Sequence, residues 1–344
     1  MIEKIFDQNI YTNYWEANEV NILQNWAWGE VKKDEGWKVL RYALRFGVNE
    51  VAIQIQVKKI PLLPYEFGYI PKINSKAYDL LIQNEKELIT EFKALGIAFV
   101  IVEFDKNCLS KYEGEYFVDY EGHIQPLQTN MVDLRKSEGE IFMQMDGNYR
   151  RNIKKAERSN ISVEFFHSGA KPLADFYSIL NEIFANTKLL ERDESYYKNL
   201  WSKLSGTKDP LAFIAIAKIE NEVVGSYLLV HDKIGCYELY GGVNKKGRDL
   251  EAGYKLKWEA KKYAKSLGLS YYDHWGVAKI LPDNTYDKKD ELYRISLFKK
   301  GFGGENVIFP KPKALLVNQF VYNYFKSLQL ANKVKTKIKK LVKS

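Results

Sequence analysis

The sequence predicts an α+β fold built from two tandem domains, in which mixed sheets are flanked by helices. A β-hairpin pattern occurs twice, and both hairpins turn at the tripeptide Asn-Glu-Val, which begins at Asn49 and again at Asn221. The two turns lie 172 residues apart in a chain of 344, which indicates two copies of one domain. A strand, a helix and a second strand then follow from Tyr240 to Val277, a pattern typical of a right-handed parallel crossover.

The first half of the chain alternates short helices and strands. In order, it predicts a helix, a hairpin, an aromatic strand or loop, a second helix and a buried strand, over residues 24–33, 37–57, 65–71, 85–95 and 98–104. In the second hairpin strand, Gln54 and Gln56 alternate with isoleucines, which predicts a half-buried sheet. Asp105 follows the buried strand directly, so we expect it at the carboxyl end of that strand.

The second half begins with a strongly basic segment. Residues 148–158 include five arginines and lysines and predict the start of a helix, whose charged face is ordinarily solvated. An amphipathic helix is predicted over 173–184, where apolar residues recur at three- and four-residue steps. Residues 191–196 are predicted to form the loop that follows this helix.

The crossover predicts a place for a ligand. Residues 252–267 predict a helix that Gly268 ends, and residues 269–277 predict the strand after it. Ligands of crossover sheets bind beyond the carboxyl ends of the strands. Gly241, Gly242 and Gly276 are expected there, where a missing side chain would let the backbone of a substrate come close.

Composition excludes several classes of site. Two cysteines without a spacing pattern and four scattered histidines predict neither a disulfide framework nor a metal centre. The polar N-terminus and the lack of an apolar run of about 18 residues predict a cytoplasmic protein without a membrane span. The net charge of +8 comes from the end of the chain, because nine lysines and no acidic residue lie from Asn306 to Ser344.

Seven short motifs occur in a fixed order between about Asn21 and Pro310. They are Gln24…Trp28…Lys32, Arg151-Asn-Ile-Lys-Lys-Ala-Glu157, Tyr240-Gly-Gly242, Trp258-Glu-Ala260, Ala264-Lys…Gly268, Tyr272-Asp-His-Trp-Gly276 and Phe298-Lys-Lys-Gly-Phe-Gly-Gly304. In this order and spacing, the chain resembles the FemABX family of peptidoglycan-bridge aminoacyltransferases. No heptad-bearing insertion occurs, so the chain is similar to the compact members that lack a coiled-coil arm.

The resemblance implies two GNAT-like domains, with the C-terminus returning to the first. The implied boundaries are 1–127 plus 310–344 for a precursor-binding domain, and 128–309 for a catalytic domain that contacts the acceptor end of a tRNA. The implied activity moves an amino acid from aminoacyl-tRNA to an amine on the stem peptide of a peptidoglycan precursor, either UDP-MurNAc-pentapeptide or lipid II. No cofactor is implied, and we expect a monomer.

The resemblance also implies roles for individual residues. Lys32 and Arg192 would bind the diphosphate of the precursor, which suits a point charge and a bidentate fork. Tyr196 and Tyr240 would line the peptide channel, with Asp105 near it. Each residue has an ordinary alternative, because Arg192 stands among acidic residues, Lys32 could be solvated and Tyr240 could pack in a core.

Phe298 and Lys299 match the pair that meets the acceptor end of the tRNA. Attack of an amine on an ester passes through a tetrahedral oxyanion, which a fixed positive charge stabilises. Lys299 could supply that charge from behind Phe298, a strand-end aromatic on this prediction and a core residue on any interpretation. Asp105 could help to take the proton of the attacking amine.

Two rival functions are open from the residues alone. GNAT-like domains also carry out acyl-CoA-dependent N-acyl transfer, in which a turn at a helix N-terminus holds the pyrophosphate. The corresponding turn, 244–253, contains two acidic residues, which disfavours CoA in the second domain. The other rival is a non-catalytic adaptor for RNA or a membrane surface, in which only the basic tail matters.

The C-terminal tail has two parts. Val321, Tyr324, Phe325 and Leu328 recur at helical spacing and predict packing onto the first domain. The segment from Lys333 to Ser344 is too rich in lysine to be buried, so we expect it to seek anions. The anions would be the lipids of the inner membrane face, where the enzyme would then be peripheral, or the phosphates of tRNA.

Overall fold

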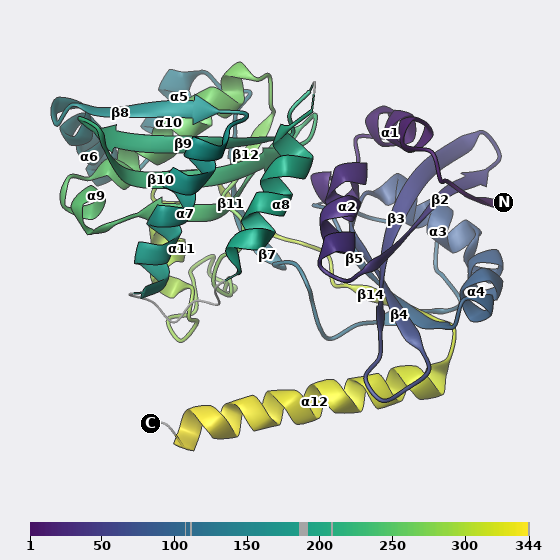
Figure 1. Cartoon of the computed structure of the whole chain (residues 1–344). Helices are drawn as coiled ribbons and strands as arrows, with labels where there is room; N and C mark the ends of the chain where they lie inside the picture. Colours follow the sequence, from purple (N-terminus) through teal and green to yellow (C-terminus); the bar gives the residue numbers. More distant parts are fainter. Residues whose placement is uncertain (107, 111, 186–191, 208, 343–344) are drawn as a thin grey trace. The chain divides into compact units, whose positions relative to one another are not determined.

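The computed structural model describes the backbone of residues 1–106, 108–110, 112–185, 192–207 and 209–342, with side chains up to residue 330 (Figure 1). Contacts within the chain define two compact units, Met1–Ile124 with Pro310–Ser344, and Gln125–Phe309. Each unit holds one seven-stranded mixed sheet flanked by helices, which confirms the predicted fold class.

The sheet of the first unit takes its sixth strand from the C-terminal part of the chain. In spatial order its strands are β1 (Ile2–Lys4), β2 (Lys38–Phe46), β3 (Asn49–Lys59), β4 (Glu66–Ile73), β5 (Ile97–Phe104), β14 (Lys313–Leu316) and β6 (Phe117–Asp119). Neighbouring strands are antiparallel except β4 and β5. The helical elements are α1 (Gln8–Ala17), the 3-10 turn η1 (Ile22–Gln24), α2 (Trp26–Asp34), α3 (Ser75–Gln83), α4 (Glu85–Ala94) and α12 (Gln319–Val342).

The predicted hairpin of this unit forms, but the prediction that its sheet is half buried is wrong. Gln54 and Gln56 of β3 are both buried, because α1, α2 and α3 all contact this strand. A buried amide needs hydrogen-bond partners. The side chain of Gln54 accepts from Arg41 Nε at 2.9 Å, and its backbone N–H donates to Gln24 Oε1 at 2.7 Å. The alternation of polar and apolar residues along β3 therefore does not indicate which side chains are exposed to solvent.

The predicted packing of the first part of the tail is confirmed. Val321 is buried, and the ring of Phe325 lies 5.2 Å from Phe67 and 4.9 Å from Phe99, centroid to centroid. The remaining prediction concerns Lys333–Ser344, and those side chains lie outside the residues that the structure describes.

The second unit repeats the plan of the first. In spatial order its strands are β13 (Glu305–Ile308), β7 (Gln128–Asp133), β12 (Tyr271–Asp273), β11 (Gly235–Val243), β10 (Glu222–His231), β9 (Ala212–Ile219) and β8 (Ile161–Phe166). As in the first unit, three antiparallel strands are followed by a crossover to a parallel neighbour, here from β11 to β12. Both Asn-Glu-Val turns join the first two strands of this plan, so the predicted duplication holds at the level of topology.

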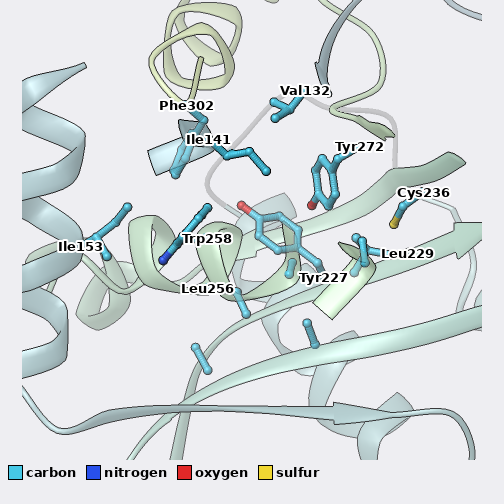
Figure 2. Packing of buried hydrophobic residues seen from close by; sticks show 14 of the residues in the cluster. Val132, Ile141, Ile153, Tyr227, Leu229, Cys236, Leu256, Trp258, Tyr272 and Phe302 are labelled. Atoms are coloured by element: carbon cyan, nitrogen blue, oxygen red, sulfur yellow. The ribbon is translucent and has the colours of Figure 1, made fainter. Parts of the chain in front are cut away.

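Helices cover both faces of this second sheet. They are α5 (Glu138–Met143), α6 (Gly147–Arg158), α7 (Ala170–Ala185), α8 (Glu194–Ser205), α9 (Lys245–Asp249), α10 (Ala252–Ser266) and α11 (Tyr293–Lys300). In Figure 1, α7 lies in front of the sheet, and α6 and α10 lie behind it. The core between the sheet and α10 contains several aromatic side chains among aliphatic ones, and Figure 2 shows Tyr227, Tyr272, Trp258 and Phe302 in it.

Three local predictions in this unit are wrong. The predicted loop over 191–196 gives way at Glu194 to helix α8, so Tyr196 is helical. Phe298 and Lys299 lie on helix α11 rather than at a strand end, and Gly301 caps that helix. The predicted strand 269–277 is only three residues long, because the backbone leaves the sheet at Trp275, where φ is +59°.

The glycines at the strand ends do not leave room for a substrate. A Cβ on Gly241 would lie 2.1 Å from the carbonyl oxygen of Ser226, and one on Gly242 would lie 2.8 Å from Ile183. A Cβ on Gly276 would meet Pro126 at 3.0 Å. The absent side chains therefore allow close packing within the chain, which corrects the expectation that they admit a ligand.

Candidate active site

Lys299 is held at the end of β12 by two backbone carbonyls. Its Nζ donates to the carbonyl oxygen of Trp275 at 3.1 Å and to that of Gly276 at 2.7 Å. The turn that presents them is fixed by Asp273, whose Oδ1 accepts from the N–H of Trp275 at 2.6 Å. Carbonyl oxygens attract an ammonium group, so this turn holds the Lys299 side chain in one place.

One donor of Lys299 is left over. An ammonium group has three N–H donors, and the third has no hydrogen-bond partner among the residues that the structure describes. Lys299 is 9% exposed. Burial lowers its pKa to about 8, with Glu238 and Asp273 opposing this shift and Lys257 adding to it. The Lys299 amino group is therefore still mostly protonated at neutral pH, and its third N–H donor lies in a site that is largely shielded from solvent.

Phe298 belongs to an aromatic cluster. Its ring centroid lies 5.2 Å from that of Tyr254, 5.2 Å from that of Phe302 and 5.9 Å from that of Tyr149. The cluster joins α11 to the first turn of α6 and to α10, so the predicted core packing of Phe298 is confirmed. Partial burial leaves some of its surface open.

Behind this cluster lies a buried group of charges that the sequence does not indicate. Glu238 on β11 pairs with Lys257 on α10, and the Tyr272 hydroxyl donates to Glu238 Oε2 at 2.5 Å. Lys257 Nζ also lies over the rings of Tyr227, Phe298 and Phe302, with distances to the centroids of 4.9, 5.7 and 5.7 Å. Burial lowers the pKa of Lys257, and Glu238 opposes that shift.

His274 completes the buried group. Its Nδ1 lies 2.8 Å from Asn130 Oδ1, and its Nε2 is buried without a hydrogen-bond partner in the described part of the chain. Burial, together with the positive charges of Lys261, Lys257 and Lys299, holds the pKa of His274 well below its usual range. This histidine is therefore neutral, with Nδ1 as the donor to Asn130.

Arg192, Tyr196 and Tyr240 form a second cluster in the same unit. The Arg192 guanidinium lies over the Tyr196 ring, 4.8 Å from its centroid, and the hydroxyls of Tyr196 and Tyr240 are 2.9 Å apart. Tyr197 packs edge-on against both tyrosine rings. The start of α8 and the end of β11 thus bring together three residues that are 48 positions apart or less in the sequence.

Lys32 and Asp105 belong to the first unit. Lys32 lies on α2, where its Nζ pairs with Glu35 and stands 5.5 Å from the centroid of the Trp28 ring. Its side chain is 11% exposed, so the alternative that it is a freely solvated charge is wrong. Asp105 follows β5 as predicted, and its Oδ1 accepts from the N–H of Lys106 at 2.7 Å.

Comparison with known proteins points to the same family as the sequence motifs. The model of the FemAB family matches residues 72–222. A lipid II:glycine glycyltransferase of Staphylococcus aureus is 24% identical over 365 aligned positions, which cover 82% of this chain and 85% of that enzyme. Both matches support membership of the FemABX family. Because this relative is named as a glycyltransferase, the comparison favours an enzyme over the adaptor alternative.

Solved structures confirm the fold. A crystal structure of FemX superposes with a TM-score of 0.79 at 20% identity, over 94% of this chain and 99% of that one. The structure of L-PGS from Bacillus licheniformis superposes with a TM-score of 0.55 at 15% identity, over 93% and 95% of the two chains. Among the residues that the structure describes, no helix has the length and apolar character needed to span a membrane.

Proposed function

We propose that this chain is a FemABX enzyme, a tRNA-dependent aminoacyltransferase that extends the stem peptide of a peptidoglycan precursor and so builds an interpeptide bridge. The observation that carries this proposal is the buried Lys299 ammonium, whose third donor is open while its other two are fixed. Such a donor suits a reaction in which negative charge develops on one oxygen atom.

The proposed reaction is the aminolysis of an ester. The precursor amine attacks the ester carbonyl carbon of the aminoacyl-tRNA, a C–N bond forms, and the carbonyl oxygen becomes an oxyanion that accepts from Lys299. When the ester C–O bond breaks, the amine gives up its proton and the ribose oxygen of the tRNA receives one. Asp105 is proposed to accept the amine proton, since a carboxylate is able to carry it between the two atoms.

Precursor binding is assigned to residues of both units. Lys32 and Arg192 are proposed to bind the diphosphate, because both are cationic and each lies against an aromatic ring that limits its motion. Tyr196 and Tyr240 are proposed to line the peptide channel, with their paired hydroxyls as polar contacts. In this scheme each unit contributes residues that bind the precursor, and the second unit carries Lys299.

An acyl-CoA donor is disfavoured by the turn after β11. CoA pyrophosphate binds free N–H groups at a helix N-terminus. In this turn the N–H of Gly247 donates to Asn244 Oδ1 at 2.9 Å, and that of Arg248 donates to the Asn244 carbonyl at 3.0 Å. Asp249 and Glu251 add negative charge beside them.

A transfer assay tests the proposal. The full-length protein is incubated with a pool of charged tRNAs, and UDP-MurNAc-pentapeptide and lipid II are offered in separate reactions. Mass spectrometry should detect one added aminoacyl residue on a precursor only when the tRNA is charged. The Staphylococcus aureus relative is named for lipid II, so the lipid-linked acceptor is the expected one. Transfer from acyl-CoA, or no transfer from any charged tRNA, would reject the function.

A further inference from the structure

Helix α6 carries a face of exposed cations. Arg151, Lys154 and Arg158 are all exposed, and their spacing of three and four residues places them on one side of the helix. The opposite side is buried through Ile153 and Ala156. The charged face is therefore fixed outward by the packing of the rest of the helix.

Little negative charge balances this face. Lys154 and Arg158 make no ion pair or hydrogen bond with any side chain described in the structure, and Arg151 bonds only to the amide oxygen of Asn148. Lys155, beside them, pairs with Glu251 at 3.2 Å. Glu157 is the one acidic residue of the helix. Such a row of cations attracts a ligand with several regularly spaced negative charges.

The first turn of α6 touches the candidate reacting centre. The Tyr149 ring packs on Phe298, and its hydroxyl donates to the carbonyl oxygen of Leu297 at 3.3 Å. The N–H of Asp146 donates to the carbonyl oxygen of Gly301 at 2.9 Å. The first turn of α6 thus contacts α11, which carries Phe298 and Lys299. The three cations lie further along α6, after this contact.

We propose that Arg151, Lys154 and Arg158 bind the phosphate backbone of the RNA whose aminoacylated end reaches Lys299. This inference rests on the proposed function for its RNA donor. The three cations span ~10 Å at 1.5 Å per helical residue, which is close to the rise of about three nucleotides of a duplex strand at ~3.4 Å each. Backbone contacts of this kind position an RNA without reading its sequence.

The same face does not suit a membrane. A helix that lies in a lipid interface inserts apolar side chains below its cations. On α6 the apolar residues Ile153 and Ala156 are buried in the core of the second unit, and no apolar residue accompanies the exposed cations. The chemistry of this surface is therefore that of a polyanion in solution.

Salt-dependent RNA binding tests the inference. The variant R151Q/K154Q/R158Q is compared with the wild-type protein by fluorescence anisotropy, using an uncharged RNA hairpin of acceptor-stem length with a single-stranded 3′ end. The matched control K171Q/K203Q/K233Q removes the same charge from elements of this unit other than α6. We expect the α6 variant to bind roughly 10- to 100-fold more weakly at 50 mM salt, and its slope of log K against log salt to be smaller by about 2–3. The control should keep the wild-type slope.

Several outcomes would overturn this assignment. They are equal slopes for the α6 variant and the wild type, equal losses in the α6 variant and the control, or a loss of binding to anionic vesicles without a loss of RNA binding. None of these outcomes bears on the result of the transfer assay, so they would reject the RNA site without rejecting the proposed function. Conversely, a protein that fails the transfer assay refutes the proposed function, and the slope comparison is still measurable on the uncharged RNA.

Discussion

Glu238 and Lys257 form an ion pair inside the second unit, with side chains that are 6% and 1% exposed. Taking two charges out of water is costly, and their attraction offsets the cost only while both are present. The Tyr272 hydroxyl holds the glutamate, and the lysine lies over the Phe298 ring. The pair thus connects two strands of the sheet to the aromatic residue next to Lys299.

Breaking this pair should destabilise the protein more than removing it. We expect Lys257→Met to lower the free energy of unfolding by about 3–5 kcal/mol, because Glu238 is left buried and uncompensated. Adding Glu238→Gln should recover a large part of that loss, since both charges are then gone. Urea unfolding of the wild type, the two single variants Lys257→Met and Glu238→Gln, and the double variant measures this coupling. Additive losses would show that the pair does not act as a unit.

Lys299→Met should lower kcat about 10²–10³-fold, which is the usual effect of losing one oxyanion donor. Precursor binding should change little, because the substitution acts on the transition state. Lys300→Met is the matched control, since Lys300 is the next residue and is exposed. A wild-type kcat in the Lys299 variant, measured by transfer from charged tRNA, would remove Lys299 from the mechanism.

The pKa of Lys299 predicts an alkaline limit on activity. The cation is the form that stabilises the oxyanion, so kcat should be constant below the pKa of about 8 and fall as the pH rises through it. An arginine keeps its charge at all these pH values. Lys299→Arg, if active, should therefore lose the alkaline fall in a pH–rate profile. An unchanged fall in that variant would assign it to another group.

Lys32→Ala and Arg192→Ala should each weaken binding of a diphosphate-bearing precursor by about 1.5–3 kcal/mol, the range for hydrogen bonds to charged groups. Lys33→Ala serves as the control, because Lys33 is adjacent, more exposed and paired with Glu30. Calorimetric titration should find both site variants nearly normal toward a stem peptide without the diphosphate. Equal weakening toward both ligands would argue against phosphate contacts.

Deleting Lys333–Ser344 should abolish salt-sensitive binding to anionic vesicles. The deletion removes six lysines, and each contributes about 1 kcal/mol near an anionic surface. Turnover on a soluble precursor should survive, since the reacting centre is unchanged. Sedimentation with vesicles and an RNA-binding assay distinguish the outcomes. Intact vesicle binding with reduced tRNA affinity would place the tail in the tRNA site instead.

Local patterns in the sequence predicted the parts of the fold that local rules govern. The two Asn-Glu-Val turns identified both hairpins, and the spacing before Gly268 identified α10 and its end, at which φ of +81° suits only glycine well. The resemblance identified Phe298 and Lys299 together. The roles of these residues stay predictions, but their positions within the second unit are now defined.

Tertiary contacts determine what the sequence could not predict. In the sequence, Lys299 looks like one of two adjacent surface lysines. Its burial depends on the carbonyl groups of Trp275 and Gly276, which lie 24 and 23 residues earlier in the chain. Glu238 and Lys257 look like solvated charges on a strand and a helix, because no periodic pattern marks a buried ion pair. The burial of Gln54 likewise depends on Arg41 and Gln24, which lie 13 and 30 residues away in the sequence.

Strand β14 has a consequence for the synthesis of the chain. It lies between β5 and β6, so residues 313–316 complete a sheet whose other strands are translated before residue 120. All the strands of the second unit leave the ribosome earlier, which allows that unit to fold first and reverses the usual N-to-C order. Until β14 arrives, the hydrogen-bonding edge of β5 is unpaired, and an unpaired apolar edge is a site of aggregation. The nascent chain is therefore most vulnerable, and most in need of a chaperone, while its second half is being made.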